Sequence, residues 1–92
     1  MQNSKGRSQV ETIVNILDGK AEALEFVIRE ESEVCEKPLQ ELKLKENLIV
    51  ACIRRRNNII YPRGGSCIKV GDRVVIVTTH QGLNDINDIL LR

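Results

Sequence analysis

The sequence predicts an α+β domain with a mainly antiparallel sheet. Residues 48–79 contain three apolar runs separated by polar or glycine-containing turns, a pattern typical of sequential antiparallel strands. Leu24, Phe26 and Ile28 alternate with more polar neighbours, which is the two-residue period of a half-buried strand. Apolar residues at helical spacing lie on both sides of this region. The predicted element order is helix, strand, short helix, three strands and helix.

The first element is predicted to be a helix. Ser8 can cap its start, Glu11 has the spacing of a capping-box partner, and Gly19 ends it. Four apolar residues follow the spacing i, i+3, i+4 and i+7, which places them on one helix face: Val10, Ile13, Val14 and Leu17. This face either packs on the sheet or pairs with another subunit, and packing on the sheet is the commoner outcome.

The remaining elements follow from local signals. The first strand covers the alternating segment near Leu24, although helix-forming residues at 21–25 leave its start ambiguous. Residues 30–36 form a solvated acidic loop, and Pro38 begins a short helix in the segment KPLQELKL. The apolar runs 48–53 and 59–61 form a hairpin that Pro62 ends. Residues 74–77 form a buried strand, and Gly82 precedes a final helix.

Composition excludes several functions. Ninety-two residues with 41% hydrophobic content support one small domain, for which association with a partner is a sensible expectation. An aromatic content of 2% and a net charge of +1 argue against binding to nucleic acid, which needs stacking platforms or a positive field. No apolar run is long enough to cross a bilayer, and the polar first residues lack the features of a signal peptide. We therefore expect a cytoplasmic protein.

No residue pattern predicts catalysis or a metal site. The three cysteines Cys35, Cys52 and Cys67 are widely spaced, and His80 has no acid or cysteine placed to form a dyad with it. Phosphate-binding and dinucleotide-binding glycine motifs are missing from the sequence. The arginines at 54–56, with Arg63 across the hairpin, could bind an anion, but alternate side chains of a strand point to opposite faces, which favours a solvated hairpin tip.

The order of four motifs resembles the C-terminal domain of TrkA-like proteins, the cytoplasmic regulatory subunits of bacterial potassium uptake systems. The motifs are KPLQELKL at 37–44, LIVACIRR at 48–55, IIYPRG at 59–64 and VGDRVVIV at 70–77. Upstream, GKAEALEFVI is similar to the first strand of that domain. The resemblance implies four mainly antiparallel strands with helices on one side, over residues 21–92. Residues 1–20 would then be a polar start and a linker helix.

The resemblance also implies a mode of action. In TrkA proteins a Rossmann domain that binds NAD or NADH precedes this domain, so we expect nicotinamide binding only in such a parent protein and no cofactor in this chain. The family's C-terminal domains form dimers, and some bind an effector such as cyclic di-AMP between subunits. The residues that could bind a two-phosphate effector here are Ile49, Val50, Arg54 and Arg55.

The leading hypothesis is a non-enzymatic regulatory domain of a Trk- or Ktr-type potassium uptake system. It would form a homodimer and associate with the inner face of the plasma membrane through a transporter subunit. The alternative is regulation of another cation or organic-acid transporter. A third hypothesis, a small enzyme that uses Cys67 or His80, has no suggested substrate.

Overall fold

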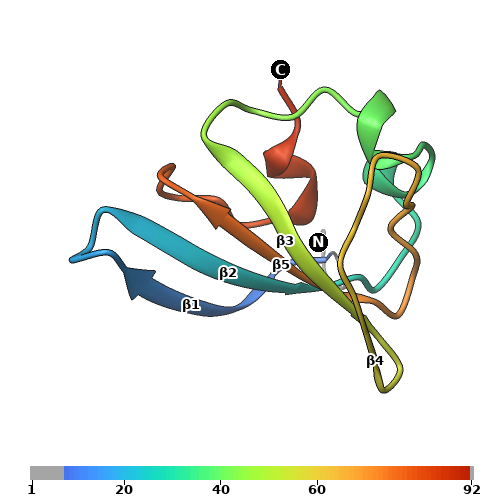
Figure 1. Cartoon of the computed structure of the whole chain (residues 1–92), viewed down its shortest axis with the longest axis horizontal. Coiled ribbons are helices and arrows are strands. Elements are labelled where there is room, and N and C mark those ends of the chain that lie inside the picture. Colours follow the sequence, from blue (N-terminus) through green and yellow to red (C-terminus); the bar gives the residue numbers. More distant parts are fainter. Residues whose placement is uncertain (1–7, 92) are drawn as a thin grey trace, which may run out of the picture.

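The computed structural model describes residues 8–91, which form an antiparallel sheet covered on one face (Figure 1). The sheet order is β1-β2-β5-β3-β4, and each neighbouring pair is antiparallel. The strands of this part of the chain are β1 (Val10–Ile16), β2 (Ala21–Val27), β3 (Leu48–Arg55), β4 (Asn58–Ile60) and β5 (Arg73–Thr78). The helical elements are the 3-10 turns η1 (Glu33–Cys35), η2 (Leu39–Glu41) and η3 (Ile86–Ile89).

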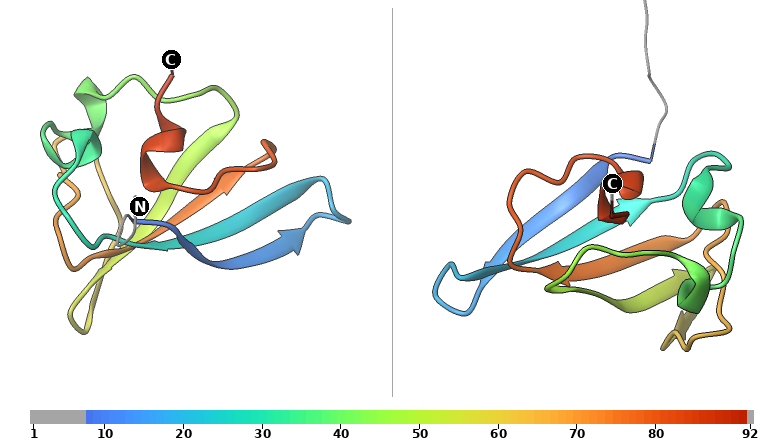
Figure 2. Two further views of the ribbon diagram at one scale, coloured as in Figure 1. Left: turned by 180° about the vertical axis from the view of Figure 1, so that it is seen from behind. Right: turned by 90° about the horizontal axis from the view of Figure 1, so that it is seen from above.

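The core lies between the sheet and these 3-10 turns. Phe26 of β2 and Ile53 of β3 both pair with Val74 of the central strand β5, and all three side chains are fully buried. We call the sheet face that carries them the inner face and the opposite face the outer face. Buried apolar residues from the turns and loops cover the inner face: Val34, Ile68, Leu83, Ile86, Ile89 and Leu90. The three 3-10 turns lie on this same side of the sheet (Figure 2).

The prediction of a linker helix is wrong, because residues 10–16 form β1, which pairs with β2. Val10 pairs with Phe26 and Thr12 with Glu25, so Glu11 is the extra residue of a β-bulge. The bulge places Val10 and Ile13 on the same face at a spacing of three, which imitates helical periodicity. Val14, by contrast, pairs with Ala23 on the outer face. The strand therefore explains the spacing without a helix.

The residues expected to cap that helix have other roles. The Ser8 hydroxyl accepts a hydrogen bond from the Arg29 backbone N–H at 2.9 Å, and Ser8 is buried. The Glu11 carboxylate forms an ion pair with Arg29 at 2.7 Å. Gly19 lies in the turn between β1 and β2 with a φ of +80°. The polar residues before Ser8 that were also predicted as part of the start lie outside the described residues.

The described part of the chain has five strands, where four were expected, and its helices are shorter than expected. The short helix after Pro38 and the final helix are the 3-10 turns η2 and η3, while the acidic loop contains a third turn, η1, that buries Val34. Asp85 caps η3 through a reciprocal capping box with Asp88.

The hairpin of β3 and β4 is confirmed, as is the alternating strand β2. The mainly antiparallel sheet is also confirmed, and together with the short helical turns it is consistent with the predicted α+β class.

A second bulge decides the directions of the side chains in β3. Val50 pairs with Ile76 and Cys52 with Val75, so Ala51 is the extra residue. Ile49, Cys52 and Arg54 consequently belong to the outer face. The inner side of β3 carries Leu48, Val50, Ile53 and Arg55.

Candidate effector groove

An open apolar groove of about 300 Å³ lies beside the start of β3. Its walls come from η2, from the chain that enters β3, and from the corner after β4. The lining residues are Leu39, Gln40, Leu44, Leu48, Ile49, Val50, Pro62, Arg63 and Gly64. Small-molecule sites are usually concave, mostly apolar and 300–1,000 Å³ in volume. The groove therefore has the character of a ligand site at the lower end of that size range.

Two of the predicted effector residues, Ile49 and Val50, line this groove. Ile49 is 59% exposed and pairs with Val77 on the outer face, so it stands where the groove meets that face. Val50 is half-buried and pairs with Ile76 of the core. As adjacent residues of a strand, they face opposite sides of the sheet, and both border the groove.

The other two predicted effector residues, Arg54 and Arg55, are not among the residues that line the groove. Arg54 is exposed on the outer face, opposite Arg73 of β5. Arg55 donates two hydrogen bonds to the Asp72 carboxylate, from Nε to Oδ1 at 2.9 Å and from Nη2 to Oδ2 at 2.8 Å. Its Nη2 also donates to the Cys67 carbonyl oxygen at 3.0 Å. The hydrogen bond to Asp72 raises the pKa of Arg55, against the smaller opposite effect of burial. Arg55 is therefore bound to Asp72, whereas the Arg54 guanidinium is not part of this ion pair.

The cation that does border the groove is Arg63, which is exposed in the corner after Pro62. Hydrogen bonds hold this corner against η2: the Leu39 N–H donates to Ser66 O at 2.8 Å and the Gln40 N–H donates to Gly64 O at 2.9 Å. Sequence reasoning noted Arg63 only as a neighbour of the arginine cluster. The backbone contacts that bring it beside η2 join two loops and have no periodic signal in the sequence.

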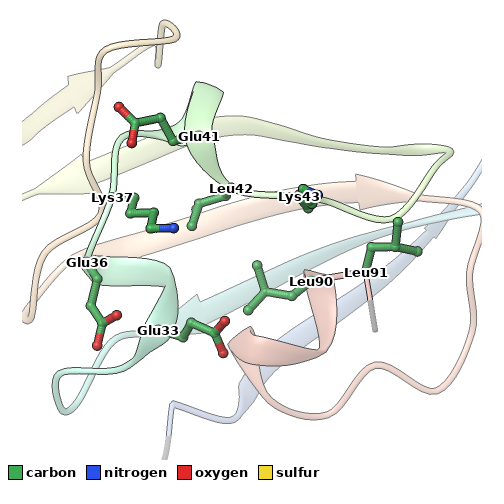
Figure 3. A pocket seen from close by; sticks show the side chains of 8 residues that line it. All are labelled: Glu33, Glu36, Lys37, Glu41, Leu42, Lys43, Leu90 and Leu91. Atoms are coloured by element: carbon green, nitrogen blue, oxygen red, sulfur yellow. The ribbon is translucent and has the colours of Figure 1, made fainter.

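A second cavity of about 240 Å³ lies between η2 and the end of the described chain (Figure 3). Leu42, Leu90 and Leu91 supply its apolar surface, and charged side chains of both signs surround them: Glu33, Glu36, Lys37, Glu41 and Lys43. Among residues 8–91, no three His, Cys, Asp or Glu side chains are grouped so that they could hold a metal ion. The mixed charge gives this cavity a less distinct ligand preference than the groove beside β3.

The polar residues considered for catalysis are dispersed. All three cysteines are half-buried free thiols. The His80 ring Nε2 lies 2.7 Å from the Glu46 carbonyl oxygen, so its hydrogen bond joins the end of β5 to the chain entering β3. The described residues also contain no helix with the length and apolar character needed to span a bilayer.

The described residues thus form a five-stranded antiparallel sheet with one covered face and an apolar groove beside β3. Residues 23–91 match the model of the TrkA-C domain, and the chain belongs to that family. It is 34% identical over 71 residues to "Trk system potassium uptake protein TrkA homolog 2" of Methanosarcina mazei, which covers 77% of this chain and 16% of that protein. It is 36% identical over 66 residues to "Trk system potassium uptake protein TrkA homolog" of Archaeoglobus fulgidus, covering 72% of this chain and 15% of that protein.

A relative in Pyrococcus abyssi, with the same TrkA homolog name, is 34% identical over 71 residues. That alignment covers 76% of this chain and 31% of the Pyrococcus protein. The chain thus spans between about one seventh and one third of the length of these relatives. The similarity concerns that part of each relative.

Proposed function

We infer that this chain is a regulatory domain of a Trk-type potassium uptake system that responds to a small effector bound in the groove beside β3. Membership of the TrkA-C family and the names of its relatives support the link to potassium uptake. The groove itself is the observation that carries the sensing role, because it joins apolar walls to an exposed arginine, Arg63. The domain would act on the cytoplasmic side, at the inner face of the membrane, through a transporter subunit.

A dimer would complete this site. The groove of one chain is open, and Ile49 projects from its border onto the outer face with 59% of its surface exposed. A second copy placed across Ile49 would close the groove and bring a second set of apolar walls and cations to one ligand, as a two-fold axis requires. A nucleotide with two phosphates, such as cyclic di-AMP, fits this arrangement because arginine binds phosphate with two parallel hydrogen bonds.

Each predicted effector residue would have a distinct role in this proposal. Ile49 and Val50 would supply apolar contact to the ligand's rings. Arg54 would offer its guanidinium from the outer face, near the second copy. Arg55 would act indirectly, because its ion pair with Asp72 holds the turn end of the β3–β4 hairpin in place. Nicotinamide binding would belong to a Rossmann domain of a parent protein.

A thermal-shift series tests the proposal. The 92-residue chain is heated with cyclic di-AMP, ATP, NADH or potassium chloride, because a ligand that binds the folded state raises the apparent melting temperature by mass action. We expect a concentration-dependent rise with a nucleotide that carries two phosphates. The variant Ile49→Asp should abolish that rise, whereas Ile59→Asp, at a residue 51% exposed on β4, should preserve it.

Two results would contradict the sensing role. One is a flat response to every nucleotide at millimolar concentration. The other is an equal loss of the response in the Ile49 and Ile59 variants, which would show that the groove is not the binding site. Complementation of a potassium uptake mutant by the parent protein, with and without Ile49→Asp, tests the physiological link separately.

A further inference from the structure

The strand β1 forms one edge of the sheet: at its start the Val10 N–H donates to Asn84 O at 2.8 Å, and beyond the bulge at Glu11 it pairs with β2 alone among the described strands. The hairpin of β1 and β2 projects beyond the part of the sheet that η3 covers (Figure 1). In an antiparallel edge strand, alternate residues turn their N–H and C=O groups away from the sheet, where another strand can bond to them. The edge of β1 is therefore a template for strand addition.

The two edges of the sheet differ in their protection against such pairing. The opposite edge, β4, has only three residues and is followed two residues later by Pro62. The segment Thr12–Ile16 of β1 contains no charge, no proline and no glycine, and three of its five residues are β-branched and apolar. Short edge strands, prolines and charges are the features that normally prevent edge pairing. Beyond the bulge at Glu11, β1 has none of them.

Apolar side chains are exposed on both faces of this hairpin. Ile13 lies on the inner face with 52% of its surface exposed, and Val14 lies on the outer face with 51% exposed. Leu17, at the hairpin tip, is 71% exposed and has a φ of +54°, a conformation that is costly for a residue other than glycine. A strand added beside β1 would cover part of Ile13 and Val14 at once, which a partner bound to one face could not do.

We propose that β1 joins two copies of this chain by antiparallel pairing with the β1 strand of the second copy, so that the two sheets become one continuous sheet. A strand that pairs with its own copy about a two-fold axis is self-complementary. The pairing also keeps both Ile13 side chains on the inner faces and both Val14 side chains on the outer faces.

The charges around β1 agree with an antiparallel partner of the same sequence. Thr12–Ile16 brings no like charges together because it carries none. At one end of the strand Glu11 forms an ion pair with Arg29 of its own chain at 2.7 Å, and beyond the other end the turn carries both Asp18 and Lys20, so antiparallel pairing brings together two ends that are each balanced in charge. Parallel pairing would place the two Glu11 carboxylates side by side.

The proposal does not rest on the proposed function. β1 lies outside the residues 23–91 that match the family model. In the sheet, β2 and β5 separate it from β3, beside which the effector groove lies. The contact through β1 is distinct from the dimer proposed across Ile49, and the β1 variant and the β1 amides report on β1 alone.

Sedimentation velocity over a concentration series tests the pairing with the 92-residue chain and two lysine variants. The variant Val14→Lys places a charge at the centre of β1, and Val70→Lys makes the same change at a residue that is 46% exposed outside the sheet. We expect Val14→Lys to weaken association by about tenfold or more, because a lysine on each copy would meet at the pairing edge. Val70→Lys should leave association unchanged.

Amide hydrogen exchange on the unmodified chain provides a second measurement that does not depend on the folding of a variant. If β1 pairs with itself, the N–H groups of Thr12–Ile16 that point away from β2 become protected as the protein concentration rises. The proposal is overturned if those amides exchange at the same rate at all concentrations. It is also overturned if Val14→Lys and Val70→Lys sediment identically to the unmodified chain.

Discussion

Arg55 and Asp72 form a two-point ion pair between the end of β3 and the turn before β5, with nitrogen–oxygen distances of 2.9 Å and 2.8 Å. The Asp72 side chain is 1% exposed, whereas that of Arg55 is 34% exposed. Asp72 also accepts a hydrogen bond from the Lys69 backbone N–H at 2.9 Å. One buried carboxylate thus connects the β3–β4 hairpin to the Gly71 turn.

Replacing this carboxylate should destabilise the domain. Asp72→Asn leaves the Arg55 guanidinium without its charge partner and weakens the bond from Lys69. We expect a loss of about 1–3 kcal/mol in the free energy of unfolding, since the arginine remains partly solvated. Urea denaturation measures the loss, and Asp18→Asn at an exposed turn residue serves as the matched control. Equal stability of the two variants would show that the pair contributes little.

The pH dependence of this pair follows from the raised pKa of Arg55. A group whose pKa is raised on folding stabilises the fold fully below its unfolded pKa and loses that contribution only as the pH rises through the folded value. Because an unperturbed guanidinium already titrates above about pH 12, the stability difference between the unmodified chain and Arg55→Gln should stay constant from about pH 6 to pH 10. A difference that shrinks within this range would contradict the assignment. Arg56→Gln, at an exposed arginine, should have little effect.

Gly64 allows the corner after Pro62 to approach η2 closely. A Cβ atom at residue 64 would lie 3.2 Å from the Gln40 Cβ and would clash with its Oε1 atom. We expect Gly64→Ala to cost up to about 1 kcal/mol and to displace Gln40 from the groove, because the exposed Gln40 amide can turn aside but its Cβ must also move. Gly65→Ala is the control, because a Cβ there meets no atom within 4 Å. Indistinguishable melting curves for the two variants would argue against the close packing.

Gly19 provides a left-handed backbone conformation in the turn between β1 and β2. Its φ of +80° lies in the left-handed region, and a Cβ there would meet no atom within 4 Å. Gly19→Ala should therefore destabilise the domain by about 1 kcal/mol through backbone strain alone, and Gly19→Asn should cost less because asparagine tolerates this region. Chemical denaturation of the three proteins measures this order, and equal stability of the glycine and alanine forms would contradict the left-handed turn.

Much of the sheet could be predicted from the sequence because burial imposes a two-residue period on its central strands. Leu24, Phe26 and Ile28 alternate regularly, and all three are buried in the core. The first strand, β1, was predicted as a helix because the bulge at Glu11 changes the spacing of its apolar residues to one that resembles a helical period. The Asp18–Gly19 pair was the available signal, since this dipeptide between apolar segments is typical of a hairpin turn.

The candidate site was less predictable for the same physical reason. A continuous apolar run does not reveal the bulge at Ala51, which determines that Ile49 belongs to the outer face and Val50 to the inner face. Neither does the sequence distinguish Arg54 from Arg55, because the choice depends on Asp72, seventeen residues from Arg55. The binding roles of Ile49, Val50, Arg54 and Arg55 therefore stay predictions.

The most direct test of the regulatory account is an equilibrium titration of the chain with cyclic di-AMP by calorimetry, with Ile49→Asp and Ile59→Asp measured alongside. The account predicts saturable binding of one ligand per two chains. It also predicts that binding is lost with Ile49→Asp and retained with Ile59→Asp. No heat of binding from the unmodified chain at millimolar ligand, or binding that survives Ile49→Asp unchanged, would contradict it.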